Sequence, residues 1–202
     1  YLQKMVKEKD NLECKEQHKV NDFIKRQKQQ DEMMNEFAEK MKDNLDKVKT
    51  DKKDEMKELL KERLEKVDKD FEKNKKLLDE LKELNDKIQK EELFEKMDKL
   101  KQQSKNQTKS LEQLVELTKK YYVEKKAEQI ADKLEKLAEK QDKLSENEKE
   151  NSAEKQEEIN KEFDEIQKEL QDLKKDNEEL KSPVDLPETA PKEKSIDEDL
   201  NK

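Results

Sequence analysis

The sequence predicts an all-α protein built from elongated, coiled-coil-type helices. Charged residues make up 51% of the chain and the usual apolar set only 28%, with no glycine and no tryptophan. A compact core needs more apolar surface than this to offset the loss of chain entropy, so exposed helices with a narrow apolar seam, or disorder, remain. Glutamate often precedes lysine by four residues, as in Glu62/Lys66 and Glu139/Lys143. Each such pair stabilises a helix by roughly 0.2–0.5 kcal/mol, which favours helix over disorder.

The first predicted segment, residues 1–49, is helical and gains a regular pattern only toward its end. Its apolar residues then follow the spacing of four and three that lets one helix pack along another: Met34, Ala38, Met41, Leu45 and Val48. Residues 49–55 contain no apolar side chain and predict a frayed helix end or an interruption of the repeat.

The second predicted segment, residues 54–101, consists of heptad helices. Its helix-pairing positions are Leu60, Leu64, Val67, Phe71, Leu78, Leu81 and Ile88. Asn74 and Asn85 occupy the same kind of position, where a buried asparagine fixes the register of packed helices at a cost in stability. Two hydrated seam sites are the alternative. The pattern restarts out of phase after Glu92.

A polar break is predicted at residues 102–110, because this stretch has no apolar residue and is rich in Ser, Asn, Gln and Thr. Ser110 and Gln113 match a capping box, in which two side chains satisfy free backbone N–H groups at the start of a helix. The central long helix is then expected at 111–144, with helix-pairing positions at Leu111, Leu114, Val123, Ala127, Ile130, Leu134, Leu137 and Leu144.

A polar loop is predicted at residues 145–152, with Asn151 and Glu154 as a second cap. The C-terminal helix at 153–181 has the most regular seam: Ile159, Phe163, Ile166, Leu170, Leu173 and Leu180. Two helices of similar length joined by a short polar loop favour an antiparallel helical hairpin. A single continuous parallel coiled coil is the alternative.

The last segment, residues 182–202, contains all three prolines and many acidic residues, and predicts a disordered acidic tail. Within it, the stretch from Leu186 to Ala190 (LPETA) resembles a sorting signal of the LPxTG type. It departs from that pattern at Ala190, and no apolar segment follows it in this sequence.

Motifs that carry catalytic or ligand chemistry are absent from the sequence. Without glycine there is no loop to cradle a phosphate. Cys14 and His18 are single residues of their kind and lack partners at the spacing of a metal site or a catalytic triad. We therefore expect no catalytic residue, no cofactor and no metal, and classify the protein as non-enzymatic. The net charge of −8, with lysines set among acidic residues, argues against a nucleic-acid partner.

Membrane contact is expected only through regions outside this chain. No apolar run is long enough to cross a bilayer. Tyr121 and Tyr122 adjoin several lysines, which indicates either aromatic residues that close a helical seam or an amphipathic contact with a membrane surface. Because the chain begins with Tyr1, we expect a fragment of a longer protein or a processed product.

The order of segments in the second half resembles a protein family. Four stretches follow one another: ELFEKMDKLK from Glu92, SLEQLVELTKKYYVEKKAEQIADKLEKLAEKQDKLSE from Ser110, KQEEINKEFDEIQKELQDLKKDNEEL from Lys155, and SPVDLPET. Over about residues 92–189 this succession resembles large, membrane-anchored, helix-rich proteins of unknown function from Bacteroidota. The resemblance implies a parent protein in the cell envelope, with transmembrane helices upstream, and offers no catalytic residues.

These features predict a structural or scaffolding coiled-coil segment of a larger bacterial envelope protein. The expected partners are the chain itself, as an intra-chain hairpin or a homo-oligomer, or another coiled-coil protein. The alternative is a surface-displayed adhesin or host-interaction rod, which a complete sorting tail beyond Lys202 would favour.

Overall fold

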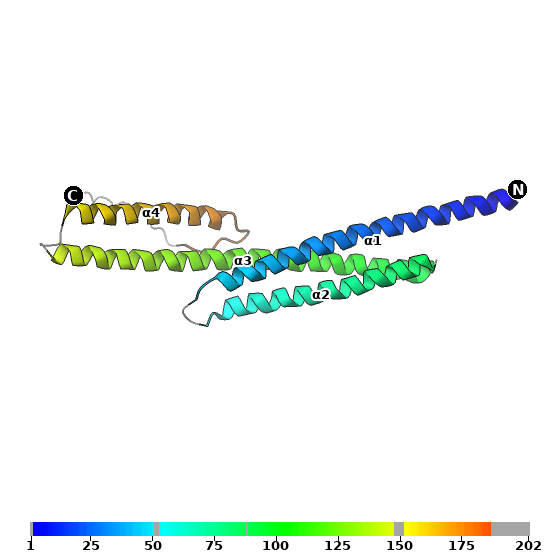
Figure 1. Ribbon diagram of the computed structural model, residues 1–202, viewed down its shortest axis with the longest axis horizontal. Coiled ribbons are helices and arrows are strands. Elements are labelled where there is room, and N and C mark those ends of the chain that lie inside the picture. The colour runs from blue at the N-terminus through cyan, green and yellow to red at the C-terminus, as the bar shows by residue number, and fades with distance from the viewer. Residues whose placement is uncertain (1, 51–52, 88, 148–151, 187–202) are drawn as a thin grey trace. The chain divides into compact units, whose positions relative to one another are not determined.

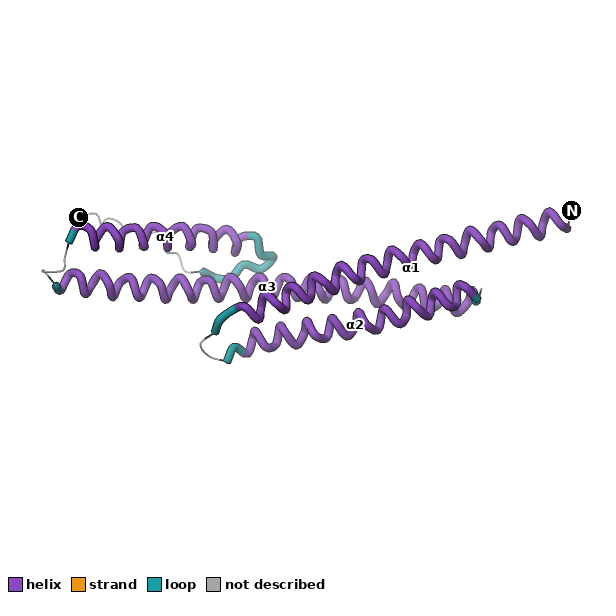
Figure 2. Tube along the Cα trace, in the orientation of Figure 1, coloured by secondary structure: helices purple, strands orange, loops and turns teal. Residues whose placement is uncertain are grey.

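The computed structural model describes residues 2–50, 53–87, 89–147 and 152–186, with side chains from Glu13 onward. Regular secondary structure in these ranges is entirely α-helical (Figure 2). The helices are α1 (Leu2–Lys47), α2 (Glu55–Asp86), α3 (Lys90–Glu146) and α4 (Ala153–Glu178) (Figure 1). The predicted all-α class is confirmed.

The chain forms two compact units, Tyr1–Val115 (unit 1) and Glu116–Lys202 (unit 2). Helix α3 begins in unit 1 and ends in unit 2. Each unit buries its own apolar residues, as a chain with narrow seams must do to offset the entropy lost on folding.

Unit 1 is an up-down-up bundle of α1, α2 and the start of α3. Asp46 and Lys61 form an ion pair beside the α1–α2 loop, and Gln17 bonds to Asn85 toward the other end, so α1 and α2 are antiparallel. Lys90, at the start of α3, pairs with Glu16 of α1 at 2.9 Å, and Ser104 of α3 bonds to Gln27 of α1, so α3 runs parallel to α1.

Unit 2 contains the predicted antiparallel hairpin. Lys140 of α3 pairs with Glu162 of α4, and Lys133 pairs with Glu169, both at 2.8 Å. The residue numbers fall along α3 as they rise along α4, which defines antiparallel helices. This arrangement confirms the hairpin and excludes the continuous parallel coiled coil for unit 2.

The structure places the predicted helix-pairing residues in the cores of the two units. In unit 1 the buried ones are Leu60, Leu64, Val67, Phe71, Leu78, Leu81, Leu111 and Leu114. In unit 2 one buried cluster is made of Val123, Ile130, Leu137, Leu144, Ile159, Phe163, Ile166, Leu170, Leu173 and Leu180, with Ala127 and Leu134 packed partly buried against it. Ile88 lies outside the described residues.

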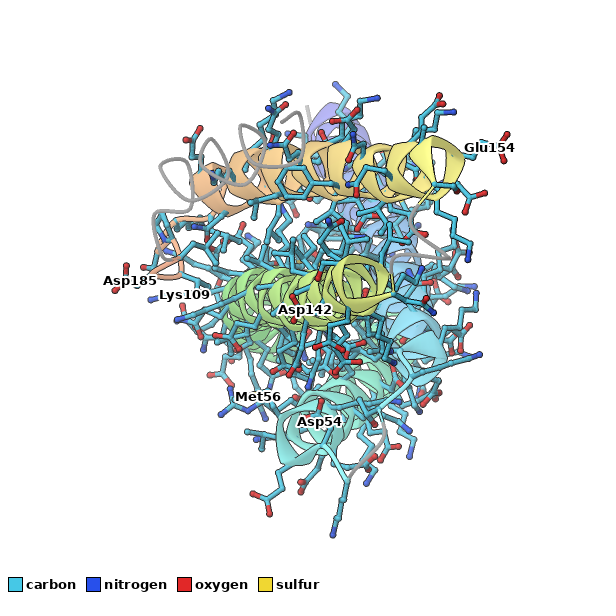
Figure 3. The ribbon with its side chains drawn as sticks, turned by 90° about the vertical axis from the view of Figure 1, so that its left-hand side faces the viewer. Asp54, Met56, Lys109, Asp142, Glu154 and Asp185 are labelled. Carbon is cyan, nitrogen blue, oxygen red and sulfur yellow. The ribbon has the colours of Figure 1, made fainter. Side chains whose placement is uncertain are left out.

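The helix starts are capped by side chains. Oδ1 of Asp54 accepts hydrogen bonds from the backbone N–H groups of Met56 (3.1 Å) and Lys57 (3.2 Å) at the start of α2 (Figure 3). Ser152 caps α4, because its Oγ accepts from the Lys155 N–H at 3.3 Å. Ser152 is therefore the N-cap of α4, and the predicted cap residue Asn151 lies outside the described residues.

The predicted polar break at 102–110 is wrong. Helix α3 passes through these residues without interruption, so the central helix expected at 111–144 is the second part of a longer one. Ser110 is exposed inside the helix and does not cap it with Gln113. The turn between α2 and α3 falls earlier, around residues 87–89 and within the predicted 54–101 segment.

Residues 102–110 stay helical because their seven-residue repeat keeps its phase. Leu100, Ser104, Gln107 and Leu111 are separated by four, three and four residues, which is the spacing that keeps one face of a helix against its neighbours. The polar residues Ser104 and Gln107 do not end the helix, because they form hydrogen bonds with polar side chains of α1 and α2.

The C-terminal end also differs from the prediction. The helix expected at 153–181 ends at Glu178, where the Leu180 N–H donates to the Asn177 carbonyl at 3.2 Å. The tail expected to be disordered at 182–202 begins as an ordered segment, because Val184 and Leu186 pack partly buried against the core of unit 2. The remainder, residues 187–202, lies outside the described residues.

Helical continuity at 102–110 is tested by proline substitution at Lys109, an exposed residue of α3 (Figure 3). Lys109→Pro removes a helical hydrogen bond and clashes with the preceding turn, so we expect a loss of about 3 kcal/mol or more in the free energy of unfolding. The matched control is Lys53→Pro in the α1–α2 loop, which should change stability little. If Lys109→Pro and Lys53→Pro both changed the free energy of unfolding in urea only slightly, residues 102–110 would be a break between helices after all.

Candidate functional site

A layer of polar side chains crosses the core of unit 1. Helix α1 contributes Gln27 (8% exposed) and Asp31 (7%), α2 contributes Asn74 (1%) and α3 contributes Ser104 (7%). Gln107 of α3 is partly buried beside them. These five residues, called the polar layer below, replace apolar residues at core positions of the three helices.

Hydrogen bonds join the polar layer across all three helices. Gln27 Nε2 donates to Asp31 Oδ1 on α1 (2.9 Å) and to Ser104 Oγ on α3 (2.8 Å). Asn74 Nδ2 donates to Asp31 Oδ2 (3.5 Å) and to Gln107 Oε1, and Gln107 Nε2 donates in return to Asn74 Oδ1 (3.3 Å). The layer is therefore one connected network rather than separate pairs.

This arrangement fixes the register of the bundle. If one helix slid by a turn, the amides of Asn74 and Gln107 would no longer meet, and each buried amide left without a partner costs about 1–3 kcal/mol. Polar residues at core positions of coiled coils select register and partner in the same way, at some cost in stability.

Asn85 makes a second polar contact at the end of α2. It is 3% exposed, and its Nδ2 donates to Asn21 Oδ1 (3.0 Å) and to the Gln17 carbonyl (3.2 Å) on α1. Asn74 and Asn85 are thus both buried and hydrogen-bonded. These contacts support the register-fixing interpretation of the two asparagines over the hydrated one.

Sequence reasoning missed Gln27, Asp31, Ser104 and Gln107. The signal was present as spacing: from Ile24, Gln27 and Asp31 follow at three and four residues, in phase with the later apolar residues of α1. A seam defined by apolar residues alone has gaps at these positions.

Unit 2 is closed by a C-terminal clasp, formed by Asn177 and residues 180–186. The Asn177 side chain binds the backbone of Val184 twice: Nδ2 donates to the carbonyl and Oδ1 accepts from the N–H, both at 2.8 Å. The Lys181 N–H donates to Glu116 Oε1 of α3. The clasp thereby holds Val184 and Leu186 against the apolar core.

Three ion pairs between α3 and α4 share one polarity. Lysines of α3 (Lys126, Lys133 and Lys140) pair with glutamates of α4 (Glu162 and Glu169). The hydrogen bond from Lys133, with the positive charges of Lys133 and Lys126, lowers the pKa of Glu169. Pairing α4 with a second α4 would place glutamates opposite one another, so the charges favour the α3–α4 contact.

Neither a metal site nor a membrane span is found in the parts of the chain that the structure describes. No group of three or more His, Cys, Asp and Glu side chains there is arranged to hold a metal ion, and no helix there is long and apolar enough to cross a bilayer. Cys14 is a free, exposed thiol. Tyr121 is 2% exposed, which is unfavourable for insertion into a membrane surface and favours the seam interpretation.

No family model, no curated protein and no solved structure matches the chain.

The register role of the polar layer predicts a non-additive mutational pair. Gln107→Leu alone leaves the buried Asn74 amide with fewer partners and should cost about 1–3 kcal/mol of unfolding free energy. Asn74→Leu added to it replaces both partners by apolar groups and should recover part of that loss. If the losses in unfolding free energy simply added in the double-mutant cycle, measured by urea unfolding, the hydrogen bonds between the two amides would not contribute to stability.

The clasp predicts a local effect of Asn177→Ala. Loss of two hydrogen bonds should release Val184 at a cost of roughly 0.5–1.5 kcal/mol for each bond, and amide exchange of Val184 should quicken while exchange at Phe163 is unchanged. Asp176→Ala, at the neighbouring exposed position, is the control. Unchanged exchange at Val184 in the Asn177 variant would show that the clasp does not depend on this side chain.

Proposed function

We propose that this chain is a non-enzymatic structural element, a scaffolding segment that acts by pairing helices within itself. The observation that supports the proposal best is the polar layer, whose hydrogen bonds are made among α1, α2 and α3 of one chain. A network of this kind specifies which helices pack together and in which register, and it does so without reactive chemistry.

Unit 2 supports the same proposal through its charges and its clasp. The pairs Lys133–Glu169 and Lys140–Glu162 join two helices of one chain with the same polarity, and the C-terminal segment packs against the core of the same hairpin. Outside the cores, lysines and glutamates cover the helix faces, which favours solvation over aggregation.

We further propose that the segment belongs to a larger protein of the bacterial cell envelope. This part rests on the resemblance of residues 92–189 to membrane-anchored, helix-rich proteins of Bacteroidota, and the described helices would then lie outside the bilayer. Partner binding by such a scaffold would add to the intra-chain pairing rather than replace it. Fractionation of cells carrying the natural gene tests this location: the parent protein should sediment with membranes.

Charge reversal tests intra-chain pairing. Lys133→Glu with Lys140→Glu places like charges opposite Glu169 and Glu162, and should lower the unfolding free energy by a few tenths to about 1 kcal/mol for each pair. Glu162→Lys with Glu169→Lys in the same chain should restore it. Light scattering should report a monomer for all variants at every concentration.

The outcome that would overturn the proposal is a rod-like dimer. If the natural chain scattered as a dimer near the length of extended helices, and if mixing the two charge-reversed chains restored stability between molecules, the pairing would be intermolecular. The protein would then be an oligomeric stalk.

A further inference from the structure

Asp31 is the charged member of the polar layer, and its surroundings disfavour that charge. Burial raises the pKa of the Asp31 carboxyl, because removal from water penalises the ionised form, and hydrogen bonds from Gln27 and Asn74 only partly oppose this effect. Among the described residues no basic side chain forms an ion pair with it. The network therefore holds an ionisable group without the partner that a buried charge requires.

One turn further along α1, Asn35 holds a buried oxygen without a donor. Its Oδ1 has no hydrogen-bond partner. Asn35 and Asp31 line the same cleft between α1 and α2, and their spacing of four residues places both side chains on one face of the helix. An ionised carboxylate only accepts hydrogen bonds, whereas a protonated one also donates.

The groups around this pair do not supply the missing donor. On the rim of the cleft, α1 presents Lys28 and Glu32, and α2 presents Glu72, Lys75 and Asp79, so charges of both signs surround it. Helix α3 faces the layer with uncharged side chains, Ser104 and Gln107. The buried Phe71 and Leu78 complete the walls and further disfavour a charge on Asp31.

We propose that Asp31 is a proton-operated lock of unit 1. When its carboxylate binds a proton from solvent through the cleft, the new O–H donates to Asn35 Oδ1 and links Asn35 to the polar layer. The carboxyl keeps one oxygen to accept the hydrogen bond from Gln27. When the proton leaves, the layer holds an unpaired charge, Asn35 Oδ1 loses its donor, and the contacts among α1, α2 and α3 weaken.

The direction of the effect follows from linkage. Because the folded form holds the Asp31 proton more tightly than the unfolded form, the stabilisation is fully present below the unfolded pKa, near 3.8. It is lost as the pH rises from that value through the folded pKa. In this window the unfolding constant of unit 1 should rise with pH, by at most about tenfold for each pH unit from this group alone. Unit 1 therefore tightens on acidification at this site.

The experiment follows the carbon resonance of the Asp31 carboxyl by nuclear magnetic resonance in the full chain, as a function of pH. Removing the acceptor with Asn35→Ala should lower the pKa of Asp31, because the protonated form loses its partner. Asn44→Ala, at an exposed position of the same helix, is the control and should leave that pKa unchanged.

The sign of the change decides the proposal. If Asn35→Ala raised the pKa of Asp31, the Asn35 amide would be donating its N–H to the carboxylate, and the lock would be overturned. No change in that pKa, or an Asp31 that titrates at its ordinary value in the natural chain, would overturn it equally.

Asp31→Asn provides a second readout. The amide carries a donor and an acceptor at every pH, so the unfolding constant of this variant should lack the part of the rise with pH that Asp31 contributes in the natural chain, when both are followed by amide exchange in unit 1. Only the consequence of Asp31 titration, a change in the contacts among α1, α2 and α3, rests on the proposed pairing role of the polar layer. The titration can fail while the chain remains a monomeric scaffold, and it can succeed in a dimeric stalk.

Discussion

The bundle of unit 1 depends on one constraint: polar groups buried at core positions must meet one another. Gln27 and Asn74 are nearly inaccessible to water, so their hydrogen bonds have to come from neighbouring helices. Residues of α1, α2 and α3, which are far apart in the chain, make these hydrogen bonds only when the three helices pack in one register. The apolar residues on either side supply most of the driving force, but leucines spaced by heptads can pack in several registers, and the polar layer selects among them.

Much of this architecture is readable in the sequence because the seams are regular. Burial of residues such as Leu64 and Phe163 follows directly from the spacing of four and three, and the antiparallel hairpin follows from two matched seams around a short polar loop. The polar layer and the turn between α2 and α3 were harder to predict. Polarity at Ser104 and Gln107 is typical of a loop as well as of a buried network, and sequence alone does not show what faces them.

Phase is the more informative signal, and it also has limits. The repeat keeps its phase across the helical residues 102–110, and it is broken between Asn85 and Leu93, where the chain turns. Yet it is also broken between Tyr121 and Val123, inside the uninterrupted α3. A break in phase therefore marks a change of packing partners, which a turn produces and which one long helix shared by two units produces as well. The clasp has no periodic signal, since it depends on a single side chain and the backbone of Val184.

The clasp also determines the topology of unit 2. Lys181 is held by Glu116, the first residue of that unit, so the polypeptide comes back to the point at which it entered. Helical turns added in matched numbers beside the loop that joins α3 to α4 would lengthen the hairpin, while Glu116 and Lys181 stayed in contact. The length of this hairpin can therefore vary in evolution independently of the Lys181–Glu116 contact that closes it.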